Sequence, residues 1–237
     1  MQTVKKNGRI TKTNGQIVQL NSEAELLIPA NVETPLRDGA FDQSDEDKMA
    51  IIEESFATIL HTLGLDLNDD SIRDTPRRVA KMYVKEIFHG LHPDEQPGIS
   101  VFDNAYQYNK MLVEKNITVM SACEHHLMPI IGKAHVAYIS SGKVIGLSKL
   151  NRIVNYYSRR PQVQERLTKQ ILCALQDALE TEDVIVMIEA KHLCVSFRGI
   201  QDESSTTVTT EYAGAFDEIE KRREFMEFVK GNFSGTF

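Results

Sequence analysis

The order in which strand-like and helix-like patterns alternate beyond residue 105 constrains the fold more than any other feature. Segments rich in β-branched residues are typical of strands, and apolar side chains three or four positions apart are typical of helices. On these patterns, strands are expected near residues 117–119, 130–139, 184–190, 192–197 and 206–212, and helices near 148–158, 162–180 and 215–229. The order of strand pair, helix pair and further strands predicts an α+β fold, in which an antiparallel sheet carries helices on one face.

A hairpin turn is expected at Ser141-Gly142, which lies between two β-branched segments. A Ser-Gly pair in that setting favours a tight turn. The residues around Val144 are therefore expected to pair with the strand that ends at Ile139.

The N-terminal part predicts a separate helical region. Ser44 is suited to cap a helix, because the acidic residues that follow it favour the positive end of the helix dipole. A second helix is expected to begin at Thr75-Pro76, and a loop is expected over residues 92–104. The chain then divides into an N-terminal arm that is flexible or packed on a partner (1–43), a helical region (44–104) and a main domain (105–237).

Composition narrows the classes of function. The formal net charge is −7, whereas nucleic-acid binding needs a basic surface that neutralises phosphates. No apolar stretch approaches the length of a membrane helix, and the N-terminus lacks the apolar core of a secretory signal. The 3 cysteines are a poor basis for a disulfide framework and fit reduced thiols. We expect a cytoplasmic protein without nucleic-acid or membrane partners.

Two clusters of cysteine and histidine are candidates for a metal site. The first contains Cys123, His125 and His126, and the second contains His192 and Cys194. In an extended strand, residues two apart point to the same side, so His192 and Cys194 are expected to face one way. Zinc favours thiolate and imidazole ligands, and three protein ligands leave the fourth position for water, which is the catalytic pattern. The alternative is that the thiols are buried apolar groups and the histidines make ordinary hydrogen bonds.

A cationic set is a candidate for binding phosphate. Lys149 and Arg152 lie three positions apart, on one side of a predicted helix near its N-terminus, and Arg198 follows the second cluster. Helix N-termini and the planar fork of arginine suit phosphate oxygens. The alternative is an ordinary solvated helix face.

A carboxylate at Glu165, preceded by Gln164, is a candidate for reading a nucleobase. A carboxylate accepts two hydrogen bonds from adjacent N–H donors, and guanine offers such a pair at N1 and its exocyclic amine. The alternative is that Glu165 pairs with Arg166 or Lys169 on its own helix.

Taken together, these segments resemble the GTP cyclohydrolase I family. The matching segments occur in the family's order and spacing, at residues 74–80, 123–126, 146–152, 160–166 and 192–199. The resemblance runs from about residue 45 to the C-terminus and implies a T-fold, in which an antiparallel sheet carries two helices on one face. It also implies a homodecamer with active sites between subunits. The implied reaction converts GTP and water into 7,8-dihydroneopterin triphosphate and formate, the first step of tetrahydrofolate or tetrahydrobiopterin biosynthesis.

The resemblance also implies a role for each matching residue. Zinc would be held by Cys123, His126 and Cys194, and His125 and His192 would act as acid and base. Glu165 would read the guanine, and Gln164 would contact the substrate near the ribose and base. The residues implied in the triphosphate pocket are Arg78, Ser148, Lys149, Arg152 and Arg198.

Two other functions compete with this interpretation. One is a T-fold nitrile reductase, a class that uses a single nucleophilic cysteine and a nicotinamide cofactor without zinc. The other is a zinc-containing scaffold or regulatory protein without catalysis. The paired Cys123 and Cys194 speak against the reductase, and the presence of His125, His192 and Glu165 speaks against the scaffold.

Overall fold

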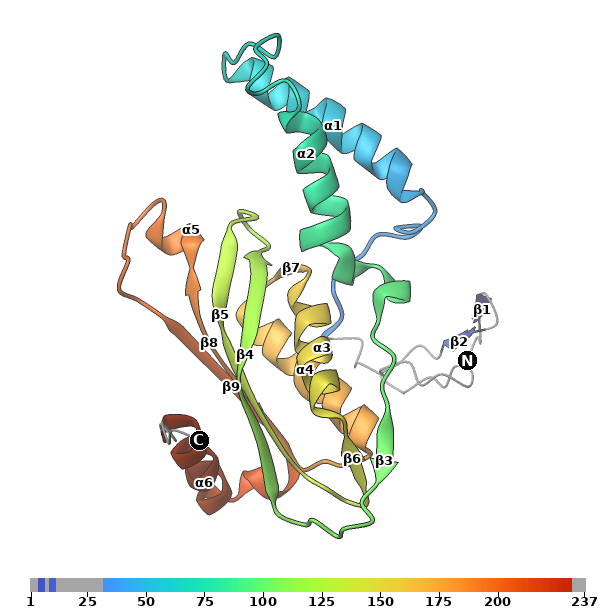
Figure 1. The fold of residues 1–237 in the computed structure, drawn as a ribbon, viewed down its shortest axis with the longest axis vertical. Coiled ribbons are helices and arrows are strands. Elements are labelled where there is room, and N and C mark those ends of the chain that lie inside the picture. Colours follow the sequence, from blue (N-terminus) through green and yellow to red (C-terminus); the bar gives the residue numbers. More distant parts are fainter. Residues whose placement is uncertain (1–3, 7–8, 12–31, 232–237) are drawn as a thin grey trace.

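A computed structural model describes residues 4–6, 9–11 and 32–231 of the chain. A twisted sheet forms the body of the molecule, and a pair of helices extends beyond one end of it (Figure 1). The five strands of this sheet lie in the order β7-β4-β5-β8-β9. A two-stranded sheet of β3 (Val101–Asp103) and β6 (Lys143–Ile145) lies beside the other end of the body, and β1 (Val4–Lys6) pairs with β2 (Arg9–Thr11).

Antiparallel pairing dominates the main sheet. The long strands β4 (Met111–Cys123) and β5 (Pro129–Ile139) pair antiparallel, β5 pairs with β8 (Val184–His192), and β8 pairs with β9 (Thr207–Tyr212). Only the two-residue strand β7 (Pro161–Gln162) pairs parallel, with the end of β4, among the strands that the structure describes. The predicted α+β fold with an antiparallel sheet is therefore confirmed, and the arrangement is that of a T-fold.

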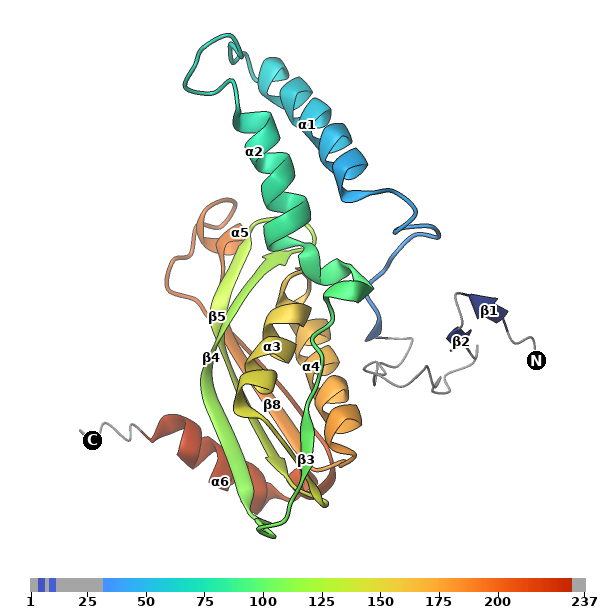
Figure 2. The ribbon, with the colours of Figure 1, turned by 45° about the vertical axis from the view of Figure 1, so that its right-hand side comes forward.

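Helices α3 (Leu147–Ser158) and α4 (Gln164–Leu179) cover one face of the sheet, and α6 (Ile219–Lys230) lies on the other (Figure 2). A short helical turn, η5 (Gly214–Asp217), leads into α6. Alternation along the strands explains both layers, because successive side chains point to opposite faces. In β5, Val136 packs into the core under α3 and α4, whereas Ala137 packs with Phe225 of α6. Each fully buried aliphatic side chain contributes about 1.5–3 kcal/mol to folding.

The helical region is formed by α1 (Asp45–Thr62) and α2 (Thr75–Lys81). The predicted cap of α1 is present, since the Ser44 side chain accepts a hydrogen bond from the Asp47 backbone N–H. The chain continues from α2 through a π-helix, η2 (Met82–Ile87), and two short 3₁₀ turns, η3 (His89–Leu91) and η4 (Pro93–Glu95). Apolar residues on α1 stay exposed to solvent, including Ile59 (48%) and Leu63 beyond its end (72%).

The prediction that the residues after the Ser141-Gly142 turn pair with the strand ending at Ile139 is wrong. The strand that follows the turn, β6 (Lys143–Ile145), pairs with β3 (Val101–Asp103) and not with β5. Both edges of β5 are already paired, one with β4 and the other with β8, so β5 has no free edge for β6. The same pairing corrects the predicted loop at 92–104, because β3 lies within it.

The predicted strand at 192–197 is also wrong. Strand β8 ends at His192, and the next residues form a short helix, α5 (Leu193–Ser196). The last residue pair between β5 and β8 is Ile130 with His192. The residue before Ile130 is Pro129, which has no N–H to donate, so the ladder between these strands stops there.

The division into an arm, a helical region and a main domain stays a prediction. Most of the predicted arm, residues 1–43, lies outside the described residues. None of the described helices is both long and apolar enough to cross a membrane.

Candidate active site

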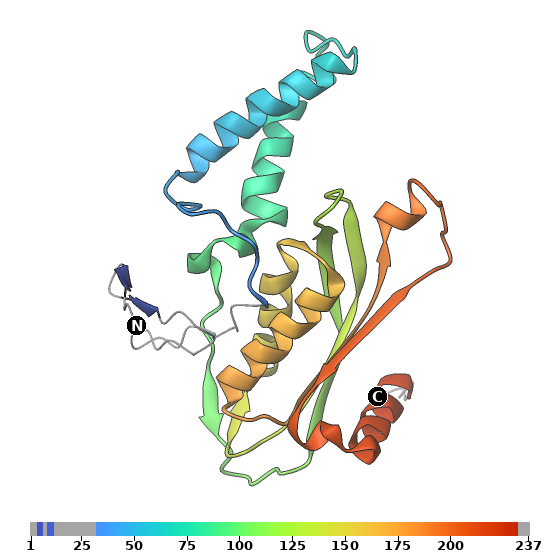
Figure 3. The same cartoon turned by 180° about the vertical axis from the view of Figure 1, so that it is seen from behind.

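The two cysteine and histidine clusters meet at one end of the sheet. Cys123 is the last residue of β4, His126 lies in the turn to β5, and Cys194 lies in α5 after β8. The β4–β5 turn and α5 lie at the same end of the sheet (Figure 3). The sulfur atoms of both cysteines and one ring nitrogen of His126 all lie within 4.8 Å of one another. The predicted route was different, because Cys194 reaches the cluster from a helical turn and not from an extended strand.

The β4–β5 turn holds the first half of the cluster by backbone contacts. The N–H of Leu127 donates to the carbonyl of Cys123 at 2.8 Å, and the N–H of Cys123 donates to the carbonyl of Met128 at 2.8 Å. Leu127 adopts a left-handed conformation (φ 52°), which an L side chain rarely does. This tight turn brings His126 back toward Cys123, whose Sγ lies 4.0 Å from the His126 Nδ1.

Burial and the nearby Cys123 thiol raise the pKa of the Cys194 thiol. Two adjacent thiolates would repel each other, and burial penalises their charge. A bound cation reverses this preference, because a coordinating thiol loses its proton. The pair is therefore suited to a positively charged occupant.

Two further predicted residues lie beside the cluster. The His125 Nδ1 lies 3.6 Å from the Cys123 Sγ, and an Arg198 nitrogen lies 3.0 Å from the His126 Nε2. The Glu124 carboxylate lies 3.9 Å from the His125 Nε2 and forms an ion pair with Arg166. Glu124 carried no sequence-based prediction, although its place between Cys123 and His125 was a signal.

His192 ends strand β8 and contacts Gln164 at the start of α4. The His192 Nε2 lies 2.8 Å from the Gln164 Oε1. Burial lowers the pKa of His192, and the nearby Glu165 carboxylate opposes that shift. Neutral imidazole therefore predominates more than it would in water, and it offers one donor and one acceptor nitrogen.

Glu165 has no ion pair among the described residues, although the sequence left open a pairing on its own helix. Arg166 is paired with Glu124, and Lys169 is paired with Glu211 at 3.1 Å. The Glu165 side chain is exposed at the first turn of α4, one residue after Gln164. Its carboxylate is free to accept hydrogen bonds from a ligand.

The structure does not bring the whole predicted phosphate set to the cluster. Arg198 lies there, but Ser148, Lys149 and Arg152 lie on the first turns of α3, which begins after β6 at the other end of the sheet (Figure 1). The Lys149 Nζ donates to the carbonyl of Gly98 at 2.7 Å. Arg78 lies in α2, where its guanidinium is 3.8 Å from Asp74. One chain alone therefore holds only part of the predicted site.

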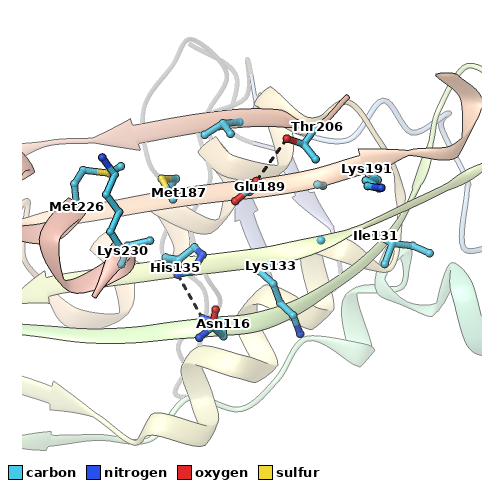
Figure 4. Close-up of a pocket in the computed structure, with 14 residues that line it drawn as sticks. Asn116, Ile131, Lys133, His135, Met187, Glu189, Lys191, Thr206, Met226 and Lys230 are labelled. Atoms are coloured by element: carbon cyan, nitrogen blue, oxygen red, sulfur yellow. Dashed lines mark hydrogen bonds between the residues drawn. The ribbon is translucent and has the colours of Figure 1, made fainter. Parts of the chain in front are cut away.

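A cavity of about 540 Å³ lies elsewhere, on the sheet face that carries α6 (Figure 4). Its wall includes Lys133, His135, Glu189 and Met226, and it contains none of the predicted site residues. Burial lowers the pKa of His135 in this wall. The candidate active site is therefore identified by its group of metal-ligating side chains and not by a cavity.

Comparison with known proteins finds the same family that the site residues resemble. The family model described as GTP cyclohydrolase I matches residues 52–230. A GTP cyclohydrolase 1 of Flavobacterium johnsoniae is 63% identical over 201 residues, which cover 85% of this chain and 90% of the relative. The GTP cyclohydrolase 1 proteins of Aeromonas salmonicida and Yersinia enterocolitica are each 48% identical, over 220 and 218 residues. These alignments cover 91% and 90% of this chain, and 100% and 98% of the two relatives. A Cys-His-Cys cluster at the end of a T-fold sheet and these matches together place the chain in the GTP cyclohydrolase I family of enzymes.

Proposed function

We propose that this chain is a zinc-dependent GTP cyclohydrolase. Water opens the imidazole ring of GTP at C8, formate leaves, and the remainder rearranges to 7,8-dihydroneopterin triphosphate. This is the first step of tetrahydrofolate or tetrahydrobiopterin biosynthesis. The observation that carries the proposal is the convergence of Cys123, His126 and Cys194. His125 lies beside Cys123, and His192 precedes Cys194 by two residues at the end of β8.

The donor set fits zinc. Bond lengths of about 2.3 Å to sulfur and 2.0–2.1 Å to nitrogen place two sulfur ligands and one nitrogen ligand roughly 3.5–3.8 Å apart in a tetrahedral site. The three candidate atoms lie within 4.8 Å of one another, so small side-chain rotations suffice to bring them to that spacing. Bound there, zinc supplies a Lewis acid that lowers the pKa of water to near neutrality.

The two histidines hold and move protons. His125 lies beside Cys123 and is exposed, so it reaches the reacting end of a bound base. His192 lies half-buried on the Gln164 side. Imidazole suits this work because its pKa lies near the operating pH. One of the pair protonates the imidazole ring nitrogen of the substrate, and the other assists opening of the ribose.

Glu165 selects guanine, because its free carboxylate accepts both the N1–H and the exocyclic amine. Gln164 precedes Glu165 at the start of α4 and contacts His192. Recognition of GTP therefore takes place at the first turn of α4.

The triphosphate is bound by a set of residues that one chain does not gather. Arg198 lies beside the cluster. The members from other elements are Arg78, Ser148, Lys149 and Arg152. We infer that some of them reach the site from a neighbouring subunit, as they would in the homodecamer that the family resemblance implies.

Incubation of the purified protein with GTP tests the proposal. Fluorescent neopterin should appear after oxidation, formate should appear in equal amount, and a zinc chelator should abolish both. Protein that is folded and loaded with zinc but forms no pterin would overturn the proposal. Consumption of NADPH with a deazaguanine nitrile would support the reductase instead.

A further inference from the structure

Both polar atoms of the Gln164 side-chain amide have hydrogen-bond partners within the protein. Gln164 is only 2% exposed, and its Nε2 lies 3.0 Å from the carbonyl oxygens of Ile188 and Thr207. The same nitrogen lies 3.1 Å from the Thr209 hydroxyl. On the opposite side, the Gln164 Oε1 lies 2.8 Å from the His192 Nε2.

These contacts fix which end of the amide faces the histidine. Carbonyl oxygens only accept hydrogen bonds, so the atom that faces Ile188 and Thr207 must be the NH₂ group. The Gln164 oxygen therefore faces His192. Because an amide oxygen also only accepts, the His192 Nε2 must carry a proton in this contact.

A second layer of hydroxyl groups supports the amide from the helix side. The Thr168 hydroxyl donates to the backbone carbonyl of Gln164 at 2.7 Å. The Thr168 and Thr209 hydroxyl oxygens lie 2.6 Å apart. Since Thr168 has used its proton, Thr209 donates to Thr168 and keeps a lone pair for the Gln164 NH₂ group. The hydrogen-bond directions are consistent from α4 through β9 to His192.

We propose that Gln164 is a positioning residue that holds His192 as the tautomer with its proton on Nε2 and its lone pair on Nδ1. The Nδ1 then serves as the acceptor that faces the substrate. No described residue forms a hydrogen bond to that nitrogen. This inference rests on the proposed function, since it assigns the proton-accepting atom of one of the two histidines.

The inference differs from a direct contact of Gln164 with the substrate, which the family resemblance implies. Both hydrogens of the amide face protein acceptors, and its oxygen faces His192. A group held in this way contributes to turnover through His192 and adds little to the binding of GTP. Partners that orient metal ligands typically contribute about 10- to 100-fold to metal affinity or activity, and we expect the same range for a partner that orients a catalytic histidine.

The test is the variant Gln164→Met, which keeps the length of the side chain and removes both polar atoms. We expect kcat to fall about 10- to 100-fold. The Kd for GTP should stay within about twofold of wild type, because the amide acts on turnover through His192 and does not bind the substrate itself. The matched control is Gln176→Met on the same helix, whose amide contacts Glu182 alone among the residues that the structure describes. That control should leave kcat and Kd unchanged.

A double-mutant cycle separates positioning from a general structural effect. In a His192→Ala background, Gln164→Met should cost no further turnover, because the residue that it positions is gone. A further loss there, or a rise in the Kd for GTP that accounts for the whole effect, would overturn the inference. If Gln164→Met does not fold, Thr209→Val provides the same comparison, because it removes one acceptor that holds the amide.

Failure of the proposed function and failure of the positioning role of Gln164 would give different results. Wild-type protein that makes no pterin from GTP would refute the function itself. Wild-type turnover together with a Gln164→Met variant of unchanged kcat would refute only the positioning role.

Discussion

The change Gly132→Ala separates the two strands that carry the two halves of the metal cluster. Gly132 lies in β5 and pairs with Ala190 in β8, two residues before His192. A Cβ added at Gly132 would lie 2.2 Å from the backbone oxygen of Glu189 and 2.6 Å from the Cα of Ala190. Real Cβ contacts essentially never fall under 3.0 Å, so β8 must move by at least 0.8 Å relative to β5.

This displacement is large for a metal site. Cys123 and His126 are attached to the β4–β5 hairpin, whereas Cys194 follows β8, so the movement opens the cluster. Metal–ligand bond lengths tolerate only about 0.2 Å, so side-chain rotations must absorb this displacement in addition to those that close the cluster around the metal. Overpacking of this kind costs about 1–3 kcal/mol, and the same energy corresponds to roughly 5- to 150-fold in affinity if it falls on the metal site.

Zinc affinity, measured by competition with a chelating dye, checks this prediction. We expect weaker zinc binding in Gly132→Ala together with a lower Tm. The matched control is Gly98→Ala, where an added Cβ meets nothing within 4 Å, and both quantities should stay at the wild-type value. Wild-type zinc affinity in a folded Gly132→Ala protein would refute the claim that the β5–β8 pairing sets the geometry of the cluster.

Three further predictions concern the histidines and the guanine contact. His192→Ala should retain zinc and assembly, measured by metal analysis and sedimentation, while turnover falls about 10²–10⁴-fold; near-normal turnover would contradict the acid–base role. Glu165→Gln should raise the KM for GTP, because one charged acceptor becomes an amide with a donor facing the guanine; steady-state kinetics with an unchanged KM and kcat would count against base recognition. Burial lowers the pKa of His135 against an opposing effect of Glu189 and a supporting effect of Lys115. The stability that comes from keeping His135 neutral is therefore present above its unfolded pKa of about 6.5 and is lost as pH falls through the folded value. His135→Gln should flatten the fall in Tm below pH 6.5, and an equal slope in both proteins would contradict this account.

The sequence predicted the sheet and its helices well, because their apolar periods are long and regular. The strand segments are rich in β-branched residues such as Val136 and Ile188, and Leu167, Ile171 and Leu175 recur at helical spacing. It failed where pairing depends on which edges are free. The pairing of β6 with β3 could not be predicted from Ser141-Gly142, since that turn does not report that both edges of β5 are occupied.

The cluster itself was predictable as a set of residue types, but its local geometry was not. Cys123 and His126 are tied by a tight turn, which local spacing indicates. Cys194 reaches the cluster from α5, and no local pattern signalled that β8 stops at His192. The network around Gln164 was also hidden, because its partners Thr207 and Thr209 lie more than forty residues away in sequence.

Spacing along its own helix favoured an ion pair for Glu165 that the structure does not contain among the described residues. Arg166 and Lys169 are suitably spaced for it, but each has another partner in the structure, Glu124 and Glu211. Tertiary contacts of this kind decide which charges remain free to meet a ligand.

Metal reconstitution tests the central claim most directly. Protein stripped of metal should be titrated with Zn²⁺ while the rate of pterin formation from GTP is followed, beside a Cys194→Ala control. We predict that the rate rises with added zinc and saturates at one zinc per chain, and that the control neither binds zinc tightly nor turns over. Full turnover in metal-free protein, or in Cys194→Ala, would contradict the account.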